Sequence, residues 1–107
     1  MDGKILYLTT LIDRVFKLLP MKEDYDSGID NHLPEYLESL YDSMSGSFGS
    51  FPCFNENTNL IDVRNNISFL TKSINLSHNR WRSIILRSTR LINAAAAEYE
   101  REANHGS

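Results

Sequence analysis

Apolar residues recur at three- and four-residue steps along four stretches of the chain, and each stretch predicts one amphipathic α-helix. The first helix is expected from about residue 2 to 19, because Pro20 lacks an amide donor and disfavours helix in the residue before it. Its apolar face comprises Ile5, Leu8, Ile12, Val15, Phe16 and Leu19. Residues 21–31 are polar and acidic, include Gly28, and are expected to form a loop.

The second helix is expected to begin at Pro34, because a proline suits the first helical turn, where its missing N–H leaves no hydrogen bond unmade. Its apolar face comprises Tyr36, Leu37, Leu40, Tyr41 and Met44. Gly46 is a natural end for this helix. Residues 45–58 are rich in Gly, Ser and Pro and are expected to be irregular.

Three phenylalanines in that break, Phe48, Phe51 and Phe54, have two interpretations. They fold back over the open end of a helical bundle, or they form an exposed hydrophobic contact loop. Exposure of three large rings carries a solubility cost, which favours the first interpretation. A loop of this length is often functional, so the three rings stay candidates for an interaction surface.

The third and fourth stretches complete the pattern. Apolar residues at alternating steps of three and four form a seam typical of helix packing, namely Leu60, Val63, Ile67, Leu70 and Ile74. Thr58 or Asn59 is expected to cap this helix, and Ser77 the next one, which runs to about Glu102. The apolar face of the fourth helix comprises Trp81, Ile84, Ile85, Leu91, Ile92, Ala95 and Tyr99. Residues 104–107 are expected to fray.

Four amphipathic helices joined by turns of a few to about a dozen residues predict one all-α domain over residues 1–107, an antiparallel four-helix bundle. A bundle completed by dimerisation is an open variant. The length of 107 residues and the hydrophobic fraction of 41% fit a single domain with a modest core.

The single cysteine, Cys53, excludes an intramolecular disulfide and favours a reducing compartment. Asp13, Arg14 and Lys17 interrupt the apolar N-terminal stretch, which argues against a secretory signal. No run approaches the ~20 apolar residues of a membrane span. The sequence therefore predicts a cytoplasmic protein without a membrane span.

Residues that carry chemistry are scattered. The histidines are His32, His78 and His105, and no two of them have the spacing of metal ligands. Cys53 has no adjacent base that would lower its pKa. Glu35 and Glu38 have a Glu-x-x-Glu spacing, but the third helix offers only Asp62 as an acidic counterpart. The sequence predicts no catalytic site, no metal, no cofactor and no small-molecule ligand, and the protein is expected not to be an enzyme.

Charge is divided unevenly along the chain. Residues 1–62 carry a net charge of −7 and residues 63–107 a net charge of +4, within a total of −3. The last helix has no acidic residue between Ser77 and Ala97, and it contains four arginines there, Arg80, Arg82, Arg87 and Arg90. Three of them, Arg80, Arg87 and Arg90, are expected to share a face, with Arg82 pointing elsewhere and Trp81 among them.

These arginines have two interpretations. In the first, the last helix packs beside the acidic second helix, and ion pairs with Glu35, Glu38 and Asp42 determine which helices are neighbours. In the second, the arginines point outward and bind nucleic-acid phosphates or an acidic protein surface. The negative net charge favours the first interpretation.

Part of the chain carries a resemblance. The run from Ile12 to Glu23, the segment Tyr36-Leu37-Glu38-Ser39-Leu40 and Gly46 resemble small uncharacterised helical proteins of Gram-positive bacteria and their phages. The resemblance covers about half of the chain; it implies a bacterial or phage setting and no activity. Helical bundles of this size also include bacteriocin immunity proteins and phage regulators, a likeness of fold alone.

Three functional hypotheses follow. The leading one is a non-enzymatic intracellular interaction or regulatory module that binds a protein partner or a second copy of itself. The second is a nucleic-acid-binding regulator that uses the arginines of the last helix, and the third is an immunity-type protein that acts near a membrane through Trp81 and those arginines. The candidate interaction surface comprises Arg80, Arg82, Arg87, Arg90, Trp81, Phe48, Phe51 and Phe54.

Overall fold

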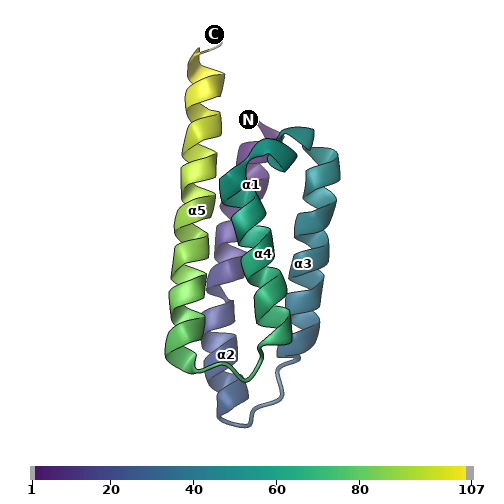
Figure 1. Cartoon of the computed structure of the whole chain (residues 1–107), viewed down its shortest axis with the longest axis vertical. Helices are drawn as coiled ribbons and strands as arrows, with labels where there is room; N and C mark the ends of the chain where they lie inside the picture. The colour runs from purple at the N-terminus through teal and green to yellow at the C-terminus, as the bar shows by residue number, and fades with distance from the viewer. Residues whose placement is uncertain (1, 106–107) are drawn as a thin grey trace.

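In the computed structural model, which describes residues 2–105, the chain passes four times along one long axis (Figure 1). The passes consist of α1 (Gly3–Phe16) with α2 (Leu18–Asp26), then α3 (Leu33–Ser50), α4 (Thr58–Lys72) and α5 (His78–His105). A short 3₁₀ helix, η1 (Pro52–Glu56), joins α3 to α4. Consecutive passes run in opposite directions, so the predicted antiparallel four-helix bundle is confirmed. Completion by dimerisation stays a prediction.

The order of the helices around the bundle determines which surfaces meet. α5 packs against α1, α4 and α2, whereas α3 packs against α4 and α2. In Figure 1, α5 stands at the left and α3 at the right, with α1 and α4 between them. α3 and α5 therefore lie on opposite sides of the molecule. The last turns of α5 extend past the end of the bundle at which α1 begins (Figure 1).

The first pass differs from its prediction at Pro20. The helix breaks at Lys17 instead, and Pro20 lies in the first turn of α2, where its missing N–H is tolerated. α2 continues to Asp26, so much of the loop expected over residues 21–31 is helical. The turn that follows contains Gly28 at φ 87° and His32 at φ 56°. The predicted helix end at Pro20 is therefore wrong, because a proline in a first turn continues a helix.

The predicted end at Gly46 is also wrong. Pro34 lies in the first turn of α3 as expected, and the helix then continues to Ser50. Ser47 and Phe48 are buried in this added turn, so packing against the core outweighs the ~1 kcal/mol that a glycine costs a helix interior. Most of the segment expected to be irregular, residues 45–58, is therefore helical, in α3, η1 or the first turn of α4.

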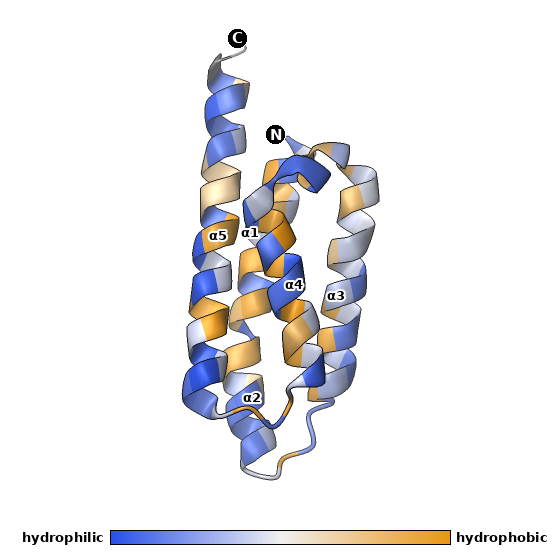
Figure 2. Cartoon of the chain, in the orientation of Figure 1, coloured by the Kyte–Doolittle hydropathy of each residue, from blue (hydrophilic) through white to orange (hydrophobic). Residues whose placement is uncertain are grey.

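The predicted apolar faces form the core. Figure 2 shows apolar segments of α1, α4 and α5 along the inside of the bundle, and hydrophilic ends of α5. The seam of α4 is buried at Leu60, Val63, Ile67 and Leu70, while Ile74 lies just beyond the helix and is partly buried. Asn57 caps α4, one residue before Thr58, the first of the two expected positions, by accepting a hydrogen bond from the Leu60 amide at 3.3 Å. The expected cap of α5 is confirmed, since Ser77 Oγ accepts from the Arg80 amide at 3.4 Å.

The fraying expected over residues 104–107 falls partly outside the described residues. α5 continues through His105, and residues 106–107 lie beyond the part of the chain that the structure describes.

Candidate interaction surface

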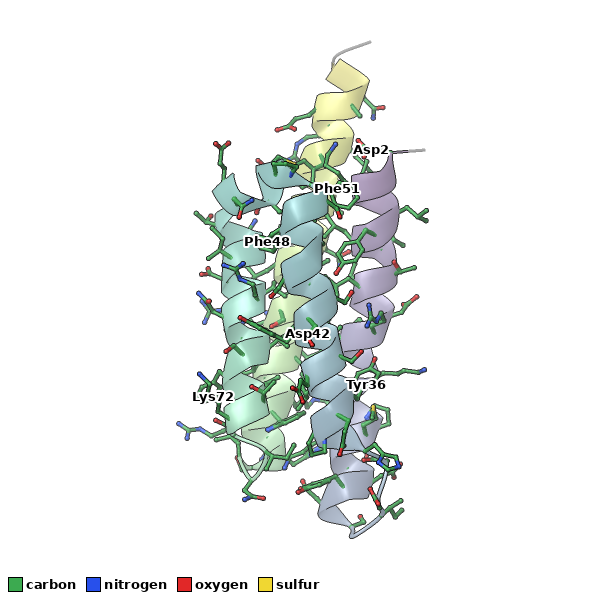
Figure 3. The ribbon with its side chains drawn as sticks, turned by 90° about the vertical axis from the view of Figure 1, so that its right-hand side faces the viewer. Asp2, Tyr36, Asp42, Phe48, Phe51 and Lys72 are labelled. Carbon is green, nitrogen blue, oxygen red and sulfur yellow. The ribbon has the colours of Figure 1, made fainter. Side chains whose placement is uncertain are left out.

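The arginines of α5 lie on its solvent side. We call them the arginine ridge, and its members are Arg80, Arg82, Arg87 and Arg90, all exposed. No ridge side chain forms an ion pair with any residue in the described part of the chain. The ridge cannot pair with Glu35, Glu38 and Asp42, because α3 lies across the bundle from α5; in Figure 3, α3 with Asp42 faces the viewer and α5 lies behind. The interpretation that these ion pairs set the topology is therefore wrong.

The opposite side of α5 faces the core. Trp81, Ile85 and Ile92 are fully buried, and the Trp81 indole donates from Nε1 to the Ser73 carbonyl oxygen at 3.0 Å. Trp81 thus does not belong to the interaction surface for which the sequence made it a candidate. The hypothesis of an immunity-type protein relied on Trp81 as its contact near a membrane, and the burial of this side chain removes that support.

Three phenylalanines, in the last turn of α3 and in its connection to α4, close the end of the bundle where α1 begins. Phe54 is fully buried and Phe48 is 4% exposed, and their ring centres lie 5.9 Å apart. Phe51 is partly buried, and its ring centre lies 5.2 Å from that of Phe54 (Figure 3). Tyr99 stacks on Phe54 from α5 at 5.8 Å, and Tyr7 of α1 completes the cluster. The favoured interpretation, rings folded back over the bundle, is confirmed, and these rings are not an exposed contact loop.

Three members of the ridge surround a shallow depression. It has a volume of about 520 Å³, and its lining is Asn79, Arg82, Ser83, Leu86, Arg87 and Arg90. These residues recur at three- and four-residue steps and so share one side of the helix. The sequence placed Arg82 apart from Arg87 and Arg90, and this part of the prediction is wrong, because all three line the depression. Arg82 does lie apart from Arg80, which lines a different hollow.

Arg80 lines a neighbouring groove between α4 and α5. This groove, about 300 Å³ in volume, is lined by Phe69, Leu76, Arg80, Ser83 and Ile84. Ser83 lines both hollows, so the groove and the depression adjoin each other at this residue of α5. Phe69 is 48% exposed and provides the largest apolar side chain of the groove.

Sequence reasoning missed Phe69, although a signal was available. Phe69 stands between Ile67 and Leu70 but off the seam of α4, and so falls on the polar side of an amphipathic helix. A large aromatic residue at such a position either packs on a neighbouring segment or stays exposed. Here it does both, beside Leu76 and Ile84.

Lys22, another residue that the sequence did not single out, anchors the segment between α4 and α5. Lys22 is only 1% exposed. Its Nζ donates to Asp26 Oδ1 at 2.8 Å and to the Ile74 carbonyl oxygen at 2.6 Å. Nζ also lies 5.2 Å from the centre of the Trp81 ring. These contacts tie α2 to the linking segment that contains Leu76, and so help to hold one wall of the groove.

A second polar corner lies near Tyr99. Asn57 Nδ2 donates to the Tyr99 hydroxyl oxygen at 3.1 Å, and burial raises the pKa of Tyr99 to about 12. The adjoining hollow, about 310 Å³ in volume, is lined by Cys53, Glu56, Asn57, Glu98, Tyr99 and Glu102. Its acidic rim contrasts with the basic surface farther along the same helix. Within residues 2–104, no group of three or more His, Cys, Asp and Glu side chains is arranged to hold a metal ion.

Comparisons place no known protein beside this chain. No protein-family model, curated protein or solved structure gives a significant match to it. Among the described helices, none combines the length and the apolar character that crossing a bilayer requires.

Proposed function

We propose that this protein is a non-enzymatic binding module that engages an acidic protein surface through α5. The observation that supports the proposal is the arginine ridge, whose four side chains are exposed and have no ion-pair partner among residues 2–105. Single exposed cations are common on protein surfaces, but here four gather on one helix with no acidic residue between Ser77 and Ala97.

The chemistry of the ridge suits carboxylates. Each guanidinium offers donors in a fixed fork that matches a carboxylate or a phosphate with two parallel hydrogen bonds. From Arg80 to Arg90 the ridge extends over about 15 Å of helix. Because no acidic residue lies between Ser77 and Ala97, the four cations repel one another, and carboxylates of a partner would relieve that repulsion.

A nucleic-acid backbone is the second candidate for the same ridge, since arginine binds phosphate with the same fork. The apolar groove beside the ridge and the net charge of −7 over residues 1–62 favour a protein partner, because the acidic part of the molecule repels a long polyanion. The proposal includes a cytoplasmic setting, supported by the exposed free thiol of Cys53, and a bacterial or phage origin, supported by the resemblance alone.

Charge-neutralising variants test the proposal. The probes are a labelled poly-glutamate peptide and a short DNA duplex, titrated at low and at raised salt against the wild type and against the triple variant R82Q, R87Q and R90Q. The matched control is R101Q, which removes one charge from α5 at an exposed position outside the ridge. The triple variant is expected to bind poly-glutamate about tenfold more weakly, because each exposed ion pair contributes ~0.2–1 kcal/mol.

Two results would contradict the proposal. One is that neither probe binds at low salt. The other is that R101Q weakens binding as much as the triple variant, which would mean that overall charge rather than the ridge attracts the probe. Tight binding of the duplex alone, with a steep dependence on salt, would replace the acidic protein by nucleic acid.

A further inference from the structure

We infer that the partner presents an acidic amphipathic helix, whose apolar side chains enter the groove of Phe69, Leu76 and Ile84 while its carboxylates pair with the arginine ridge. This inference rests on the proposed function and names the chemistry of the partner at the same surface.

The groove supplies the apolar part of the site. Phe69 is 48% exposed, and it shares the groove with Leu76 and Ile84, which are partly buried. Isolated exposed apolar residues are normal on a protein surface, but here one exposed and two partly buried apolar residues, from α4, α5 and the linking segment, line one hollow of about 300 Å³. A phosphate backbone has no apolar group to place there, whereas a protein side chain does.

Charge complements the groove along α5. Arg80 and Arg87 stand four residues before and three residues after Ile84, on the same side of the helix. Arg82 and Arg90, together with Arg87, line the depression that adjoins the groove at Ser83. An apolar centre with cations before, after and beside it matches a partner with an apolar stripe flanked by carboxylates.

The helix α4 adds no opposing charge close to the groove. Its one acidic residue, Asp62, stands seven residues before Phe69, about 10 Å along the helix axis. Between them, Asn66 Nδ2 donates to Ser88 Oγ at 3.0 Å, and this contact joins α4 to α5 beyond the groove. The receptive surface is therefore bounded at one end and extends about 15 Å along α5, the length of about three helical turns.

The secondary structure of the surface favours a helix as the occupant. Peptides that bind as strands need an exposed sheet edge, and this surface consists of two helices and a short link. A helix that lies in a groove presents anchors at steps of three, four and seven residues, and its neighbouring positions carry the charges. Such a partner covers Phe69 with apolar side chains and pairs its carboxylates with the arginines at the same time.

Two designed peptides of identical composition test the inference. One spaces leucines at helical steps among glutamates, and the other scrambles the order so that the leucines share no face. The protein is used as wild type, F69S, R80Q and the control F16S, which changes a 41%-exposed phenylalanine on α1. Circular dichroism checks that each variant keeps the helical fold.

The amphipathic peptide is expected to bind the wild type about tenfold or more tightly than its scrambled version, because an ordered face buries leucines that the scrambled order leaves in water. F69S should remove this preference and leave the weak binding common to both peptides. R80Q should weaken the binding of both peptides, and F16S should change neither.

Equal binding of the two peptides would overturn the inference and leave the proposed function in place. Failure of both peptides to bind, together with no effect of the ridge variants, would overturn both. A dimer of the wild type in light scattering that F69S dissociates would assign the groove to a second copy of this chain and would also overturn the inference.

Discussion

Phenylalanine lies close to arginine in two regions of the bundle, and the two regions treat these residue types in opposite ways. At the end where α1 begins, Phe48 and Phe54 are buried, and the guanidinium carbon of Arg64 lies 4.3 Å from the centre of the Phe48 ring. On the face of α4 and α5, Phe69 is half exposed and the arginine ridge has no ion-pair partner among the described residues. Ring and cation contact each other in the first region, whereas in the second the ring is half exposed and the cations form no ion pair with a described residue.

The comparison separates stability from binding. A buried aromatic cluster lowers the free energy of the folded chain by removing apolar area from water and by filling the interior. A half-exposed ring beside arginines without ion pairs adds little to stability, so the fold does not require these residue types at this surface. Substitutions in the two regions are therefore expected to have effects of different kinds and different sizes.

The largest effect is expected from the matched pair F54A and F69A. F54A leaves a cavity among four aromatic rings and should lower the free energy of unfolding by ~3–5 kcal/mol. F69A, at a half-exposed position, should lower it by only ~1 kcal/mol. Urea denaturation of both variants measures the difference, and similar losses would break the comparison.

An intermediate effect is expected from alkaline pH through Tyr99, at the aromatic end. Burial raises the pKa of Tyr99 from 10.0 to about 12, so the folded chain holds the phenolic proton more tightly than the unfolded chain. The resulting stabilisation is fully present below pH 10 and is lost as the pH rises from 10 toward 12. A pKa shift of this size corresponds to a contribution of ~1–3 kcal/mol to the free energy of unfolding.

Denaturation of the wild type and of Y99F across that range measures this contribution as a difference between two curves. Y99F removes the titrating group together with the hydrogen bond from Asn57 and keeps the ring on Phe54. If the free energies of unfolding of the wild type and of Y99F change with pH in parallel through the alkaline range, Tyr99 does not link folding to pH.

The smallest effect is expected from the ridge itself. The triple variant R82Q, R87Q and R90Q should change stability by less than ~0.5 kcal/mol, with a slight gain at low salt as repulsion between like charges is removed. Thermal unfolding at low and at raised salt measures this change. A clear loss of stability would reveal that the arginines serve the fold, and the contrast between the two regions would then disappear.

The buried helical faces could be predicted from the sequence, because apolar residues at helical spacing both identify a face and drive its burial. Leu60, Val63, Ile67 and Leu70 recur at helical steps, and all four are buried. The ends of helices were less predictable. Pro20 and Gly46 are both breakers in isolation, yet one falls in a first turn and the other in a helix whose extension buries Phe48. The helix continues past Gly46 because Phe48 packs against segments distant in the sequence, and a local pattern does not show such packing. Pro20 is tolerated because the preceding helix already ends before it, at Lys17.

The candidate site was predictable by residue type but not by place. A run of arginines without nearby acids identified the ridge, whereas its exposure depended on α5 lying across the bundle from α3. The same tertiary order buried Trp81 and placed Phe69 beside Leu76 and Ile84. Lys22 could not be found from the sequence, because a charged residue in an expected loop gives no sign that it will be buried.

The packing of α5 on α1 has a consequence for the order in which the protein is made. α5 contacts α1 more extensively than any other helix, yet 61 residues separate the end of α1 from the start of α5. During synthesis the apolar side of α1, with Leu8, Leu11 and Val15, stays uncovered by α5 until α5 has left the ribosome. A nascent chain that stalls before His78 therefore exposes this side, and is the form most open to aggregation or to capture by a chaperone.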